Sequence, residues 1–168
     1  VGRALGSDNV GVFLYIVLQF VVCAWVFGQV TAFAAKLGCP RWAQYAVTAF
    51  FALNPVWGAF IQTQVKDTLY TGLFVLFVLK TADLLLFPQE WRGRARRLAA
   101  YAVLGILCCL LRKNGIYSVV PMLLASAFVV SEKQLCRPVL AVLLAVCIGA
   151  FGFDTFTEKA LDIPAGSV

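Results

Sequence analysis

The chain has 168 residues, of which 62% are hydrophobic and only 13% are charged, and its formal net charge is +6. A single soluble core of this size could not bury so much apolar surface, so the composition excludes a water-soluble domain. It predicts an all-α, polytopic protein of the cell membrane, with membrane lipid around it. Six cysteines lie mostly within apolar runs and histidine is absent, which argues against zinc, haem and iron–sulfur sites. We expect no cofactor, although a divalent cation stays open, and no nucleic-acid partner.

Six hydrophobic segments follow one another along the chain, and we expect each to be helical. They are Val10–Ala35, Trp42–Gln64, Asp67–Phe87, Leu98–Leu111, Ile116–Val130 and Pro138–Phe153. The first alone exceeds the roughly 20 apolar residues that a crossing needs. The second is expected to bend or end near Asn54, because Pro55 removes a helical hydrogen bond and disfavours helix before it. The fourth and fifth are short, and therefore are tilted helices, broken helices or a pair that enters the membrane and returns.

The distribution of cations predicts the side of each connection. If the segments cross in alternation, one set of connections carries Lys36, Arg41, Arg92, Arg94, Arg96, Arg97, Lys133 and Arg137, and the other carries Arg3, Lys66, Arg112, Lys113 and Lys159. The first set holds more cations and is therefore predicted to be cytoplasmic. Its densest part, EWRGRARR, is interpreted as a topology signal, with a patch that binds nucleic acid or lipid as the alternative.

One pair of ionisable residues lies inside the third segment. Lys80 and Asp83 stand at positions i and i+3, and therefore on one face of a helix. Ionisable residues within a span are functional candidates, and this pair could couple ion movement to transport. The structural alternative is that Lys80 extends to the cytoplasmic boundary and pairs with Asp83.

The third segment opens with a second charged pair, Lys66 and Asp67, on the predicted external side. An acidic residue near a helix N-terminus is stabilised by the helix dipole by about 0.3 to 1 kcal/mol, which is a purely structural role. The alternative is a role for Asp67 in binding or catalysis.

The motif LLRKNGIY joins the fourth and fifth segments on the same predicted side. Arg112 and Lys113 either anchor a turn at Asn114 and Gly115 or hold an anion at the membrane surface. An arginine can bind a phosphate through two parallel hydrogen bonds, and a glycine can expose backbone N–H groups to an anion. Both interpretations remain open at this point.

The order of these motifs resembles a known group of proteins. A span ends in NP, an external stretch closes with KD at the head of the next span, and LLRKNGIY and EKALDIP follow. From about Gly11 to Pro164 the chain is similar to a largely uncharacterised bacterial family of multi-pass membrane proteins that is grouped with the GT-C glycosyltransferases. The most specific match is R-x-N-G-[IL]-Y, at Arg112, Asn114, Gly115 and Tyr117.

The resemblance implies an enzyme of the cell envelope that transfers a sugar from a polyprenyl-phosphate carrier to an acceptor outside the cytoplasm. By the same resemblance, one set of residues would contact the lipid phosphate, namely Lys66, Arg112, Lys113, Asn114 and Gly115. Asp67 would be an acidic site residue or would orient Lys66. In such enzymes the principal acid lies in the first external loop, and Asp8 is the only carboxylate ahead of the first segment. The main catalytic acid could therefore lie outside this chain.

We expect a single transmembrane domain over residues 1–168, in which 154–168 begin an external segment. The chain has no initiator methionine and no signal sequence at its start, so it is expected to be an internal piece of a longer protein. Two other function classes stay open. One is a transporter or flippase for a lipid-linked or anionic substrate, although no internal repeat typical of transporters is evident. The other is a membrane scaffold in which every charge serves topology.

Overall fold

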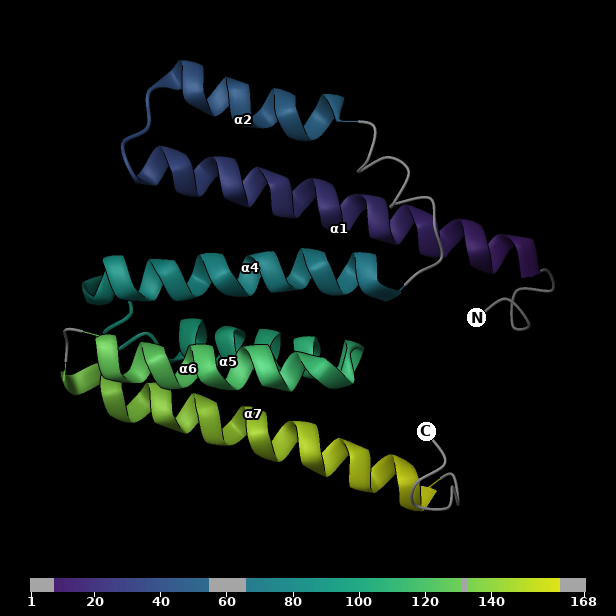
Figure 1. The fold of residues 1–168 in the computed structure, drawn as a ribbon, viewed down its shortest axis with the longest axis vertical. Helices are drawn as coiled ribbons and strands as arrows, with labels where there is room; N and C mark the ends of the chain where they lie inside the picture. Colours follow the sequence, from purple (N-terminus) through teal and green to yellow (C-terminus); the bar gives the residue numbers. More distant parts are fainter. Residues whose placement is uncertain (1–7, 55–65, 131–132, 161–168) are drawn as a thin grey trace. The chain divides into compact units, whose positions relative to one another are not determined.

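The computed structural model describes residues 8–54, 66–130 and 133–160, and within these ranges the regular elements are helices, without a strand (Figure 1). This confirms the all-α class. The elements are α1 (Asp8–Lys36), α2 (Arg41–Leu53), α4 (Lys66–Leu86), η2 (Pro88–Glu90), α5 (Ala95–Leu111), η3 (Lys113–Gly115), α6 (Ile116–Val129) and α7 (Lys133–Ala160). Two compact units divide the chain, Val1–Leu79 and Lys80–Val168, with the boundary inside α4. Each unit is described by itself.

Three of the described helices are long and apolar enough to cross a membrane, over Val10–Lys36, Asp67–Leu86 and Leu135–Gly152. They correspond to the first, third and sixth predicted segments, and they make this a membrane protein. The other predicted segments form shorter helices of 13, 17 and 14 residues in α2, α5 and α6. At about 1.5 Å per residue these span roughly 20 to 26 Å, less than the roughly 30 Å of the hydrocarbon core.

In the first unit, α1 ends at a glycine, and α2 ends before a proline as the sequence predicts. Helix α1 closes with Gly38 at φ +82°, while the Cys39 N–H bonds the Ala34 carbonyl at 3.1 Å. This is a Schellman C-cap, in which glycine adopts the left-handed conformation without steric cost. Helix α2 ends at Leu53 with Asn54 in an extended conformation, which confirms the predicted end before Pro55. Residues 55–64 of the predicted second segment lie outside the described residues.

The first unit is built on contacts of α1 with two other helices. The rings of Phe27 on α1 and Phe51 on α2 stack with centroids 4.3 Å apart. On the α4 side, a Cβ added to Gly72 would lie 3.8 Å from Val26, so the glycine permits ordinary close contact between the two backbones. Helix α2 itself contains no buried residue, so it lies on the surface of this unit.

In the second unit, α5, α6 and α7 pack against one another and alternate in direction, so that α5 and α7 are parallel (Figure 1). Gly149 of α7 faces Ile106 of α5, and a Cβ on this glycine would approach the Ile106 Cδ1 atom to 3.0 Å. Helix α7 differs from the prediction, because it begins at Lys133 and carries Pro138 inside its first turns. A proline there costs only one backbone hydrogen bond, which the packed helix tolerates. The helix continues to Ala160, so the predicted external segment from residue 154 opens as helix.

Candidate functional site

The turn between α5 and α6 contains most of the phosphate-binding residues implied by the sequence. Arg112 ends α5 with an extended backbone, at φ −142° and ψ 120°, and η3 follows directly. The Gly115 N–H donates a hydrogen bond of 2.8 Å to the Arg112 carbonyl, which closes the turn. Arg112 and Asn114 are exposed, whereas Gly115 is buried. The side chain of Lys113 lies outside the described residues.

The predicted turn at Asn114 and Gly115 is therefore confirmed, but the glycine contributes in a different way. Its φ is −59°, an ordinary helical value, and its N–H is already bonded to Arg112. The glycine is thus buried in the turn and does not present its N–H group to an anion. What the turn offers to a ligand is the Arg112 guanidinium, placed at the positive end of the α6 dipole.

The last turns of α7 lie at the same end of the second unit as this turn. Helices α5 and α7 are parallel and meet at Ile106 and Gly149. Arg112 lies as far beyond Ile106 as Thr155 lies beyond Gly149, so the two are at the same level along the helix axes. The sequence analysis predicted that the RKNG motif and the segment from residue 154 share one side. The backbone of this unit agrees with that prediction as far as Ala160.

Lys66 and Asp67 open α4, where the sequence placed the head of the third span. Asp67 is partly exposed in the first helical turn, and its carbonyl accepts a hydrogen bond of 2.8 Å from the Thr71 hydroxyl. This position agrees with stabilisation by the helix dipole. The side chain of Lys66 lies outside the described residues. These residues belong to the first unit and Arg112 to the second, so a joint site of the two remains a prediction.

The ionisable residue inside the third span, Asp83, has two partners across the α4–α5 connection. The indole Nε1–H of Trp91 donates to Asp83 Oδ2 at 3.0 Å, and the Arg97 guanidinium lies 3.9 Å from the same oxygen. Arg97 also donates to Glu90 at 3.0 Å. Lys80 is exposed. The sequence analysis suggested Lys80 as the partner of Asp83, whereas the structure pairs Asp83 with Trp91 and Arg97.

A buried layer below Asp83 makes the connection rigid. The hydroxyls of Thr81 and Tyr101 share a hydrogen bond of 2.6 Å, and the Trp91 ring meets the Tyr101 ring edge-on at 5.8 Å. Trp91 and Tyr101 are each 1% exposed. The sequence analysis interpreted the surrounding EWRGRARR only as a topology signal, because nothing in the local pattern shows that the Trp91 N–H bonds back to α4. The network holds α4, η2 and α5 together, which is a structural role.

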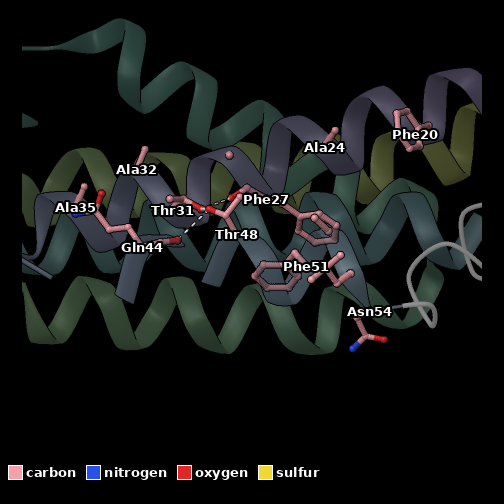
Figure 2. A pocket seen from close by; sticks show the side chains of 13 residues that line it. Phe20, Ala24, Phe27, Thr31, Ala32, Ala35, Gln44, Thr48, Phe51 and Asn54 are labelled. Carbon is pink, nitrogen blue, oxygen red and sulfur yellow. Dashed lines mark hydrogen bonds between the residues drawn. The ribbon is translucent and has the colours of Figure 1, made fainter. Parts of the chain in front are cut away.

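A groove of about 750 Å³ runs between α1 and α2 in the first unit, and sequence analysis missed it (Figure 2). It is lined by Phe20, Ala24, Phe27, Gly28, Thr31, Ala32 and Ala35 of α1, by Gln44, Thr48, Phe51, Ala52 and Leu53 of α2, and by Asn54, which directly follows α2. The small residues Ala24, Gly28 and Ala32 recur every fourth position and leave room along one face of α1. That spacing was the signal in the sequence that could have revealed the groove.

Three polar residues of this groove, Thr31, Gln44 and Thr48, form hydrogen bonds near its α1–α2 loop end. Thr31 and Thr48 share a hydrogen bond of 3.1 Å, and the Gln44 amide donates to the Cys39 carbonyl at 2.8 Å. The remaining wall is mostly apolar, with the stacked pair Phe27 and Phe51 at its centre. The groove therefore suits an apolar chain rather than a charged group.

The described residues contain no group of three or more His, Cys, Asp or Glu side chains placed to hold a metal ion. The cysteines are free thiols, among which Cys23, Cys108 and Cys109 are buried. They pack as small apolar side chains.

The fold and these sites define a helical membrane protein with a cationic turn at one end of its second unit and an apolar groove in its first. The chain matches DUF6020, a family of unknown function, over residues 1–167, and it therefore belongs to that family. No curated protein and no solved structure matches it. The expected membership in an uncharacterised family is thus confirmed, whereas nothing in these comparisons links the family to the GT-C glycosyltransferases.

Proposed function

We propose that this protein is an integral membrane glycosyltransferase, or part of one, that transfers a sugar from a polyprenyl-phosphate donor to an acceptor on the external face. The observation that carries the proposal is the exposed Arg112 at the rigid α5–α6 turn, within the element R-x-N-G-[IL]-Y. The turn joins two apolar helices, which supports a position of its guanidinium where a lipid headgroup would meet the end of the hydrocarbon.

The chemistry of this reaction needs a fixed cation at that depth. When the bond between the sugar anomeric carbon and the carrier phosphate breaks, negative charge develops on the phosphate oxygen that leaves. A guanidinium can bind two phosphate oxygens through parallel hydrogen bonds and stabilise this charge. The backbone hydrogen bond between Gly115 and Arg112 holds the turn before the ligand arrives, so little conformational freedom is lost on binding.

The reaction also needs a base that accepts the proton of the acceptor hydroxyl as the new glycosidic bond forms. Asp67 is the carboxylate of this chain that we propose for the role, at the start of α4. If the principal catalytic acid lies outside this chain, the role of Asp67 is to orient Lys66.

The apolar groove between α1 and α2 supports a lipid substrate independently of the cation. A carrier with a long prenyl chain needs an apolar groove in which the chain can lie without separating the packed helices. The groove is largely apolar, and Gly28 meets open space, with nothing within 4 Å of an added Cβ. Asn54, at the end of α2, lines the groove as well (Figure 2).

Binding of a polyprenyl phosphate to the detergent-solubilised protein tests the cation. We expect the phosphate to bind more tightly than the matching polyprenol, and Arg112→Ala to weaken its binding by about 10- to 100-fold, since hydrogen bonds to charged groups are worth about 1.5–3 kcal/mol. Arg41→Ala, which removes an exposed arginine of the first unit, is the matched control. Equal binding by Arg112→Ala and the parent protein would contradict the proposal.

A second variant tests the groove separately. Gly28→Leu places a side chain in the open space of the groove and should weaken binding of the polyprenyl phosphate and of the polyprenol to the same degree. Gly152→Leu on α7, where an added Cβ also meets nothing within 4 Å, is the control for an added leucine. If Gly28→Leu leaves both affinities unchanged, the groove does not hold the prenyl chain.

The transporter alternative would use the same external cations, with Lys80 and Asp83 as an additional coupling pair. Because Asp83 is bonded to Trp91 and Arg97 in a layer that holds the α4–α5 connection, we do not advance it. Loss of substrate movement in Lys80→Ala with no loss in Asp67→Ala would reopen it.

A further inference from the structure

The end of the second unit that carries Trp91 presents three exposed arginines, Arg92, Arg94 and Arg96, which we call the arginine platform. We propose that the arginine platform binds the phosphate headgroups of anionic phospholipids at the membrane surface. This inference does not depend on the proposed glycosyltransferase function, because it concerns the opposite end of the unit from Arg112.

The platform has a fixed backbone. Trp91 is buried against Asp83, and Gly93 turns the chain with φ +70°, a conformation that other residues adopt only with strain. Directly after the platform along the chain, Arg97 donates a hydrogen bond of 3.0 Å to Glu90. The segment that carries the three arginines is thus tied down at both ends while their side chains face outward.

The nearby acids do not neutralise the platform. Asp83 and Glu90 are both engaged with Arg97, and no ion pair in the described ranges involves Arg92, Arg94 or Arg96. The first turn of α5 contains no acidic residue either. Cations beside a helix N-terminus are unfavourable, because the dipole there is also positive. An anion at this surface would relieve that repulsion.

The location of the platform favours lipid as the source of the anion. It follows the membrane-length stretch Asp67–Leu86 after one short 3₁₀ turn, and Leu86 at the helix end is 56% exposed. The adjacent helix α7 begins at the same end of the unit and adds the exposed Arg137 (Figure 1). Clusters of basic residues directly beyond a membrane helix attract anionic lipids, at about 1 kcal/mol for each residue near the surface.

The test compares lipids that differ only in headgroup charge. The detergent-solubilised protein is titrated with palmitoyl-oleoyl phosphatidylglycerol and with the matching phosphatidylcholine, and bound lipid is counted by native mass spectrometry. We expect selective binding of phosphatidylglycerol. The triple variant Arg92→Gln, Arg94→Gln, Arg96→Gln should lose roughly 100-fold in affinity, while the corresponding triple lysine variant retains most of it.

A matched variant removes three cations elsewhere, Lys36→Gln, Arg41→Gln and Lys80→Gln, and should bind phosphatidylglycerol like the parent. Circular dichroism confirms that each variant remains helical. Equal binding of the two lipids by the parent overturns the proposal, and so does an unchanged affinity in the triple glutamine variant. Displacement of the lipid from the platform by inorganic phosphate or by a short RNA at comparable concentration would overturn the assignment to lipid.

Discussion

The two ends of the second unit both carry arginines near a short 3₁₀ turn, but Arg97 at one end and Arg112 at the other have different surroundings. At the Trp91 end, Asp83 and Glu90 engage Arg97, and Trp91 is buried below them. At the Arg112 end, the turn is closed by one backbone hydrogen bond and the guanidinium is exposed. The difference teaches that residue type does not assign a role. Arg97, which bonds carboxylates of the connection, stabilises the fold, whereas the exposed Arg112 is the residue that we propose meets a ligand.

The largest effect should come from removing the carboxylate at the Trp91 end. Asp83→Ala leaves the buried Trp91 N–H without its acceptor and takes one partner from Arg97, so we expect a loss of about 3 kcal/mol in unfolding free energy. Denaturation in detergent, followed by circular dichroism, measures it. Lys80→Ala, an exposed change on the same helix, should stay within about 0.5 kcal/mol. A similar loss of unfolding free energy in both variants would show that the hydrogen bond between Asp83 and Trp91 does not stabilise the fold.

The second test removes Arg97 and Arg112 in two separate variants. Arg97→Ala should lower the unfolding free energy by about 1 kcal/mol, because its bonds are partly exposed, and should leave binding of the polyprenyl phosphate unchanged. Arg112→Ala should show the reverse pattern, with stability kept and binding reduced at least tenfold. The comparison between the two ends fails if both variants lose stability and binding together.

The third test uses one tyrosine at each end. Tyr101→Phe removes the buried hydroxyl that bonds Thr81 at 2.6 Å and should cost about 1 kcal/mol of stability. Tyr117→Phe, at a side chain that is 78% exposed, should be neutral for stability. Thermal unfolding of both variants in the same detergent gives the comparison. Equal unfolding temperatures for the two would contradict it.

The last test concerns the contact between α5 and α7, the two parallel helices that run between these ends. Gly149→Ala should be about 1 kcal/mol less stable than Gly152→Ala, because its Cβ would meet Ile106 at 3.0 Å whereas Gly152 meets open space. Both variants gain the same helix propensity, so the difference in unfolding free energy isolates the contact. The companion change Ile106→Val should remove part of this difference. If it does not, the α5–α7 contact is looser than the structure indicates.

Local chemistry made several features predictable from the sequence. The apolar runs predicted the long helices α1 and α4, because a crossing needs only length and hydrophobicity. Pro55 predicted the end of α2 and the Asn114–Gly115 pair predicted a turn, since each acts on its own backbone. The start of α7 was misplaced at Pro138, because proline is tolerated in the first turns of a packed helix.

The candidate site was predictable only in part. The sequence placed Arg112 at a turn, because its neighbours along the chain define that turn. It did not reveal that the Gly115 N–H is bonded to Arg112, or that α1 and α2 enclose a groove, since both depend on geometry that the pattern does not contain.

By itself, then, the sequence determined that this is a helical membrane protein, where most helices begin and end, and which cations stand at their ends. These properties depend on residues that are neighbours along the chain, so hydropathy and backbone preference suffice to predict them. Only the tertiary structure decided that Asp83 faces Trp91 and Arg97, and that Gly149 meets Ile106. Such pairings depend on the direction of side chains from separate helices, which is set by packing and not by the order of residues along the chain.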